Sequence, residues 1–95
     1  MNIGFKAFAV IQPPPNSNKY RLGEEIAQRC KNDRIADVEV YEKPDTDEVM
    51  IYHPSEELFQ NCIRPAILDT DCRNASFGPD GKYEILLENW KIMGT

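Results

Sequence analysis

Few residues in this chain of 95 residues could perform acid–base or nucleophilic chemistry. His53 is the only histidine, and it ends an alternating stretch that favours a strand. A pair with Cys62 would combine a thiol nucleophile and a base, but only if the thiol left the apolar face of a helix. A single imidazole at a strand end is more often a structural residue. The sequence therefore predicts no catalytic residues.

Aspartates in two irregular segments are the candidates for a metal site. Asp45 and Asp47 lie in one turn, and Asp69 and Asp71 are two residues apart in another. Carboxylates suit Mg²⁺ and Ca²⁺, but neither set has the glycine and the twelve-residue spacing of a calcium loop. Solvated turn residues are the simpler interpretation, so we expect neither a metal nor a cofactor. A metal-assisted enzyme using these aspartates is the least favoured hypothesis for function.

The cysteines and the hydropathy pattern indicate a cellular compartment. Cys30, Cys62 and Cys72 are odd in number and contain no CxxC pair, so a complete disulfide framework is excluded and buried free thiols are expected at Cys30 and Cys62. No apolar run approaches the roughly 20 residues that span a bilayer, and the N-terminus lacks a basic segment typical of secretion signals. We therefore expect a cytoplasmic protein without membrane contact.

Half of the 16 acidic side chains lie in about a quarter of the chain. The formal net charge is −5, and residues 35–57 carry eight acidic groups against the single cation Lys43. A negative field repels nucleic acid and attracts basic surfaces. This distribution predicts a protein partner with a basic surface and no direct binding of nucleic acid.

Periodicity and turn residues predict one α+β domain over residues 1–95. Ser17 or Asn18 begins a helix that reaches about Asp33, and Ser55 begins a second helix that should end or kink near Arg64 because Pro65 follows. The residues between the helices alternate as a hairpin around the turn 44–47. The predicted strands are 3–11, 35–43, 48–53 and 82–90, with a possible short extra strand near 73–77.

The resulting β-α-β-β-α-β order resembles the ferredoxin-like superfold. That resemblance implies a four-stranded antiparallel sheet with both helices on one face and the first and third strands in its centre. Metal-carrying relatives hold CxxC in the first loop, and acylphosphatases bind an anion there with glycine-rich backbone and an arginine. The segment QPPPNSN has neither thiols nor glycines, and its three prolines remove backbone donors, so a stiff connector is expected.

Alternation along the strands predicts that aromatic side chains lie on the sheet face opposite the helices. Aromatic residues on such a face resemble the stacking platform of RNA-recognition domains, but carboxylates outnumber cations here, which disfavours phosphate binding. An apolar patch fringed by acids is typical of a protein interface. The alternative is that the C-terminal tail or a second copy of the chain covers this face.

The first hypothesis for function is a small binding module, not an enzyme, that inhibits or regulates a partner protein. Bacterial immunity proteins and phage-encoded inhibitors are of similar size and charge. The second hypothesis is a sheet-mediated homodimer that binds a small ligand. The residues expected to bind the partner are the apolar Phe8, Tyr41, Met50, Tyr52 and Trp90, and the acidic Glu39, Asp45, Asp47 and Glu48.

Overall fold

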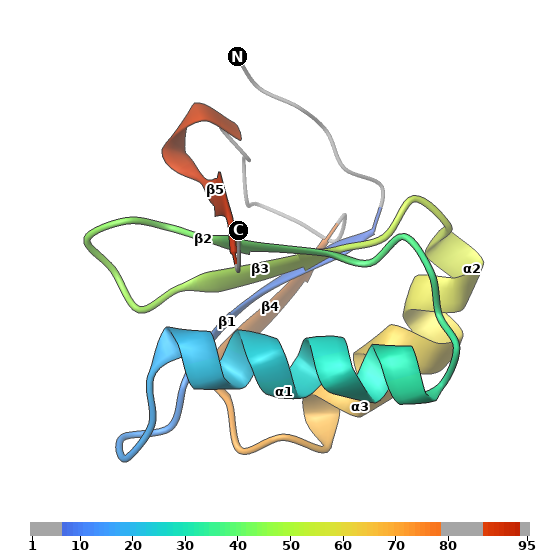
Figure 1. Cartoon of the computed structure of the whole chain (residues 1–95), viewed down its shortest axis with the longest axis horizontal. Coiled ribbons are helices and arrows are strands. Elements are labelled where there is room, and N and C mark those ends of the chain that lie inside the picture. The colour runs from blue at the N-terminus through green and yellow to red at the C-terminus, as the bar shows by residue number, and fades with distance from the viewer. Residues whose placement is uncertain (1–6, 79–86, 94–95) are drawn as a thin grey trace.

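Figure 1 shows a computed structural model of the chain, in which residues 7–78 and 87–93 are described. Five strands form one antiparallel sheet, and two helical stretches lie on the same side of it (Figure 1). The chain therefore has an α+β fold. In order, the elements are β1 Phe8–Gln12, α1 Lys19–Asn32, β2 Glu39–Glu42, β3 Val49–Tyr52, α2 Glu56–Leu58, a π-helical turn Phe59–Ile63, α3 Arg64–Leu68, β4 Arg73–Gly78, a 3-10 turn Leu87–Asn89 and β5 Lys91–Ile92.

The strands lie in the order β4-β1-β3-β2-β5, and every neighbouring pair is antiparallel. The first and third strands have neighbours on both sides, as the sequence predicts. The strand count is five rather than four. The segment expected as a short extra strand forms β4, which pairs with β1.

The C-terminal strand differs most from expectation. Of the strand predicted over 82–90, residues 79–86 lie outside the described residues, and Leu87–Asn89 form a 3-10 turn instead. Glu88 and Asn89 are residue types that pack poorly in strands, which explains why a turn replaces the alternating pattern here. The strand follows later, as β5, and it pairs with β2 at the other edge of the sheet.

Strand β1 is apolar on both faces because it lies inside the sheet. Ala9 and Ile11 point to the helical side, whereas Phe8 and Val10 belong to a cluster on the opposite side. This alternation confirms the predicted faces. The predicted strand began at residue 3, but residues 3–6 lie outside the described residues.

Helix α1 begins and ends where the sequence predicts. The Asn18 side chain caps it by accepting a hydrogen bond from the Arg21 backbone N–H at 2.9 Å. Leu22, Ile26 and Cys30 are buried at four-residue spacing against the sheet. The helix ends at Asn32 as predicted, within one residue.

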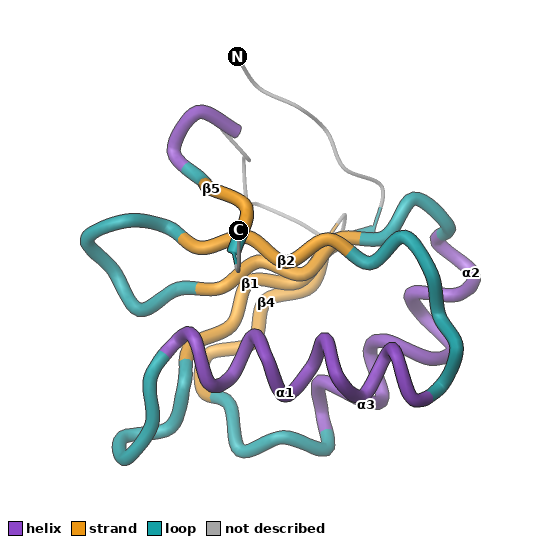
Figure 2. Tube along the Cα trace, in the orientation of Figure 1, coloured by secondary structure: helices purple, strands orange, loops and turns teal. Residues whose placement is uncertain are grey.

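The hairpin of β2 and β3 is present but shorter than expected. Strand β2 begins at Glu39 rather than at residue 35, because Arg34 and Asp37 have positive φ angles of 58° and 64°, which an extended strand does not allow. The turn closes with a hydrogen bond of 3.2 Å from the Thr46 N–H to the Lys43 carbonyl. Figure 2 shows the resulting loop at the end of the sheet away from the second helix.

The second helical stretch does not end at Arg64, but its regular hydrogen bonding is interrupted just before that residue, where the sequence predicts an end or a kink. Ser55 caps its start, accepting from the Leu58 N–H at 3.3 Å, and the helix continues through Pro65 to Leu68. A π-helical turn precedes Arg64, whose N–H donates to the Phe59 carbonyl five residues back. The extra residue shifts the register, so that Pro65 falls in the first turn of α3, where a missing N–H is tolerated.

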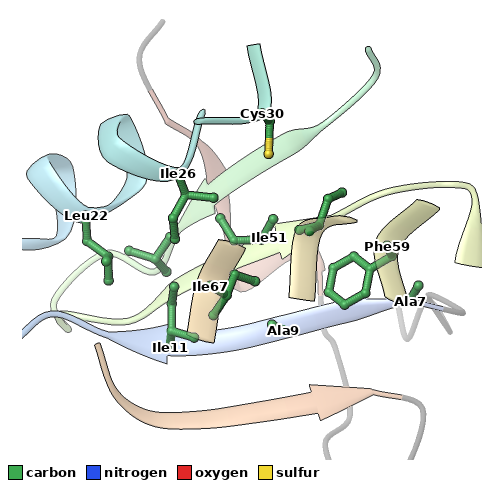
Figure 3. Close-up of a cluster of buried hydrophobic side chains, with 11 residues drawn as sticks. Ala7, Ala9, Ile11, Leu22, Ile26, Cys30, Ile51, Phe59 and Ile67 are labelled. Atoms are coloured by element: carbon green, nitrogen blue, oxygen red, sulfur yellow. The ribbon is translucent and has the colours of Figure 1, made fainter. Parts of the chain in front are cut away.

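The main core lies between the helices and the sheet, as Figure 3 shows. Its buried side chains are mostly aliphatic, and Phe59 is the largest. Cys30 belongs to this core, and burial raises the pKa of its thiol. Cys62, expected to be buried too, is half-buried. The cluster comprises Ala7, Ala9, Ile11, Leu22, Ile26, Cys30, Val49, Ile51, Phe59, Ile63 and Ile67.

Candidate functional site

The aromatic face predicted to be open is a second buried cluster. Phe8 and Trp90 keep 4% and 7% of their surface exposed, and Met50 none. Tyr41 is also buried in it, and Tyr52 packs against it half-buried. Trp90 follows the 3-10 turn, which lies on the side of the sheet away from the helices (Figure 2). The expectation that these side chains are displayed on an open face is therefore wrong, because the C-terminal segment supplies the indole that covers it.

Two close contacts fix this cluster. A β-carbon added at Gly78 would overlap the ring of Phe8, so the ring lies directly against the bare backbone of β4. The ammonium of Lys43 lies 5.8 Å from the centroid of the Trp90 ring, within the range of a cation–π interaction. The aromatic residues thus act first as a core for the outer face.

The acidic side chains of β2 are largely paired within the chain. Glu42 accepts from Lys19 Nζ and from the Tyr20 hydroxyl, each at 3.0 Å, and the bond from Lys19 is the main cause that lowers the pKa of this carboxyl. Glu39 accepts from the Tyr41 hydroxyl at 2.9 Å. Burial first, and then this bond and the charge of Glu39, raise the pKa of Tyr41 to about 12.

The turn of the hairpin is tied to other parts of the chain. Asp47 accepts from Gln12 at 2.6 Å and from Arg73 at 2.8 Å, and the Arg73 Nε–H donates to the Pro13 carbonyl at 2.6 Å. The proline-containing loop is thus joined to the hairpin and to β4. The Asp47 carboxylate therefore serves an internal network.

Glu48 and Asp45 are the remaining acidic residues expected to bind the partner. Glu48 lies 3.7 Å from Lys43 Nζ. Asp45 is exposed at the tip of the turn, where its φ of 68° places it in the left-handed region. The hairpin therefore presents less unpaired negative charge than its composition suggests.

His53 is buried, and backbone groups occupy both of its ring nitrogens. Nε2 lies 2.8 Å from the Ala36 carbonyl, which only accepts, and Nδ1 lies 2.9 Å from the Ser55 N–H, which only donates. The imidazole is therefore neutral with its proton on Nε2. A catalytic base needs a free ring lone pair, but the lone pair on Nδ1 accepts the hydrogen bond from the Ser55 N–H. The His53 side chain therefore links β3 to the second helix.

Neither aspartate pair forms a metal site in the described part of the chain. Among residues 7–78 and 87–93, no three histidine, cysteine, aspartate or glutamate side chains converge closely enough to hold an ion. Asp69 instead lies 3.3 Å from Arg29. The same part of the chain contains no helix with the length and apolar character to cross a membrane.

An apolar groove of about 460 Å³ runs along the edge of the sheet, between α1 and β2. Tyr20 and Ile92 keep 54% and 44% of their surface exposed there, so two of the four large apolar side chains that are exposed among the described residues lie along one groove. Glu24 and Glu39 are the acidic residues of its lining, and the Glu39 carboxylate accepts from the Tyr41 hydroxyl of the outer cluster. The groove is lined by Tyr20, Gly23, Glu24, Ala27, Val38, Glu39, Val40, Ile92 and Met93.

The floor of the groove explains a glycine in the middle of α1. A β-carbon at Gly23 would overlap the sulfur of Met93 and would lie 3.2 Å from Val40 Cγ1. Glycine costs about 1 kcal/mol relative to alanine in a helix, so its position here reflects the close approach of Met93. The missing side chain of Gly23 leaves a notch in α1, and the Met93 side chain fills this notch.

A second depression continues the groove along α1. It shares Ala27 and Val38 with the first and extends to Lys31 and Arg34, with Asp37 as its carboxylate. The combined surface is therefore apolar in the middle, acidic at the end near Glu24, and net basic at the other end.

Of the residues expected to bind a partner, only Glu39 lines this groove. The sequence contains two signals that point to the rest of it. Gly23 interrupts a well-formed helix, and Ile92 and Met93 are apolar residues that follow the last predicted strand. Neither signal identifies which surfaces meet, because the contacting residues are far apart in sequence. Comparisons with protein-family models, curated proteins and solved structures found no match to this chain.

Proposed function

We propose that this chain is a protein-binding module that regulates its partner, and that the partner docks in the groove between α1 and β2. The observation that carries the proposal is the exposure of Tyr20 and Ile92 beside Glu24 and Glu39. Exposed apolar surface rimmed by charge is where protein interfaces form. The acidic rim favours a partner with a basic surface.

The alternative hypotheses have less support. A homodimer through the aromatic face would need Phe8, Met50 and Trp90, which one chain already buries. A metal-assisted enzyme would need Asp47 and Asp69, which are engaged with Arg73 and Arg29.

We also propose that the architecture is ferredoxin-like with one added strand. The order β4-β1-β3-β2 joined by two crossover helices is the one that this superfold implies, and β5 extends it beyond β2. Cytoplasmic localisation belongs to the same proposal, because Cys30, Cys62 and Cys72 are free thiols.

Partner capture with matched variants tests the proposed function. The full chain and its Glu24→Lys and Glu25→Lys variants would be used to capture proteins from the native host, and the affinity of the purified partner would be measured. Glu24 lines the groove, whereas Glu25, the next residue of α1, lies beside a different depression near Pro14. Both side chains are exposed, so circular dichroism should be unchanged.

We expect Glu24→Lys to weaken the affinity for the partner at least about fivefold, which is equivalent to about 1 kcal/mol. Glu25→Lys should keep the affinity within about twofold of that of the natural chain. Tyr20→Ala should weaken it at least as much. A partner that distinguishes neither Glu24→Lys nor Tyr20→Ala from the natural chain would place its binding site elsewhere and refute the proposal.

A further inference from the structure

The C-terminal segment of the chain already occupies part of the groove as a strand. Ile92 lies opposite Tyr41 and Lys91 opposite Glu42, and the Met93 N–H donates to the Val40 carbonyl at 2.9 Å. The edge of β2 is therefore able to accept an added strand, which is a recurrent way in which proteins bind peptides.

The chemistry of this resident segment matches the surface that receives it. Lys91 pairs in register with Glu42, Ile92 lies in the apolar groove, and Met93 enters the notch above Gly23. A cation followed by two apolar residues thus fits this edge. An unbranched apolar side chain suits the notch, because the bare helix backbone leaves room for a narrow group.

The resident strand is also short. Strand β5 contains two residues, both exposed, whereas stable strands usually have about five or six. Trp90, immediately before it, is anchored in the cluster on the outer face. Segments with few buried contacts open at low free-energy cost, so residues 91–93 can leave the edge while Trp90 stays in place.

We propose that the groove binds an extended partner segment with a basic residue followed by two apolar residues, which adds to β2 in place of residues 91–93. This inference rests on the proposed function and specifies the partner's chemistry. Glu42, which lies opposite Lys91 in the register, complements the basic residue, and Glu24 adds negative charge along the same groove. Because the added strand is antiparallel to β2, its following residues run past Val38 toward Lys31 and Arg34, where an acidic residue fits.

A synthetic peptide tests this mode of binding. The probe is a fluorescein-labelled peptide of sequence GKIMGDG, and its control is GEIMGKG, which keeps the apolar pair and reverses the charges. Fluorescence anisotropy would measure binding to the full chain, to Met93→Ala, and to Met93→Ala combined with Gly23→Ala. Alanine at position 23 favours helix, so this variant should fold while its β-carbon blocks the notch.

We expect Met93→Ala to bind the probe about tenfold more tightly than the natural chain does. This gain corresponds to a natural chain in which residues 91–93 occupy the groove about nine-tenths of the time and exclude the probe. In the Met93→Ala background, where no resident methionine competes for the notch, Gly23→Ala should weaken binding of the probe at least about fivefold. The charge-reversed peptide should bind at least about fivefold more weakly than the probe. In an NMR titration, the amide signals of Lys91 and Ile92 should shift as these residues leave β2, while that of Ser76 in β4 should not.

Four outcomes would overturn the inference. Equal binding of both peptides would contradict the charge complementarity, and equal binding by Met93→Ala with and without Gly23→Ala would contradict the role of the notch. A dimer of the natural chain in light scattering that Met93→Ala dissociates would identify the occupant as residues 91–93 of a second copy. If the probe fails while Glu24→Lys still weakens the captured partner, the strand-addition mode is wrong and the proposed function stands.

Discussion

The two faces of the sheet are both buried, but by different means. On the helical side, α1 and the second helical stretch place aliphatic side chains and Phe59 over β1 and β3. On the outer side, the cluster is mainly aromatic and smaller, and it includes Trp90 from the C-terminal segment. An apolar strand face therefore does not by itself indicate an open binding surface.

The exposed apolar surface lies where these two coverings meet. Helix α1 covers the sheet from one side, and the described C-terminal residues pair with β2 from Glu42 to Val40. The groove between them leaves Tyr20 and Ile92 exposed. We propose that the partner binds at this edge, where the two coverings leave apolar surface accessible.

The largest effect is expected on the helical side, at Phe59. Its side chain is fully buried, so Phe59→Ala should lower the free energy of unfolding by about 3–5 kcal/mol through lost burial and a cavity. Urea denaturation followed by circular dichroism measures this. The neighbouring Leu58→Ala is the control and should cost less than about 1 kcal/mol, because Leu58 is exposed. Equal losses would show that the helical side is not the main core.

A somewhat smaller effect is expected on the outer face. Trp90→Ala should lower the free energy of unfolding by about 2–4 kcal/mol, because the indole belongs to a smaller cluster and stays slightly exposed. Opening of this face should also increase the fluorescence of the dye ANS. If Trp90→Ala left both the stability and the dye fluorescence unchanged, the outer cluster would contribute nothing to the fold.

His53 is the one polar residue among the described buried side chains, and it lies where β3 meets the second helix. His53→Ala should cost about 1–3 kcal/mol, because it leaves the Ala36 carbonyl and the Ser55 N–H without their partner. His53→Gln keeps a donor and an acceptor and should recover part of the loss. Urea denaturation at neutral pH compares the three chains, and full stability of His53→Ala would contradict the structural role.

The smallest effect on the free energy of unfolding at neutral pH is expected at Tyr41, on the outer face. Burial and the bond to Glu39 raise its pKa to about 12 from an ordinary value of about 10. The folded state therefore keeps the phenol protonated more readily than the unfolded state does. The resulting stabilisation is complete below about pH 10 and is lost as the pH rises toward 12.

Tyrosinate absorbance measures this shift directly. The difference between the titrations of the natural chain and Tyr41→Phe isolates one phenol, and its midpoint should lie well above that of an exposed tyrosine. Glu39→Gln removes the neighbouring negative charge and should lower the midpoint. A midpoint near 10 for Tyr41 would show that the outer face is open to water.

Local signals in the sequence predicted much of the fold. Asn18 caps α1, Ser55 caps the second helix, and alternation assigned Phe8 and Met50 to the face opposite Ile51. The edges were harder to predict. Strand β5 has two residues, which is too short for a detectable period. The π-helical turn allows the helix to continue past Pro65, which the general rule that proline ends or kinks a helix does not predict.

The candidate site was predicted only in part, through Glu39. The sequence marks Gly23 as an anomaly in a helix, but Met93, which explains it, lies 70 positions away in the chain. The acidic hairpin was read as a binding surface because composition does not reveal that Lys19 and Arg73 pair with Glu42 and Asp47.

Where the helices begin, which residues alternate and which strand faces are apolar can all be predicted from the sequence. These properties depend on caps, turns and periodicity, which act over a few neighbouring residues. Only the tertiary structure decided that Trp90 closes the outer face and that a groove stays open beside Gly23. Those outcomes depend on contacts such as that between Tyr41 and Ile92, whose free energy arises only when distant segments of the chain meet.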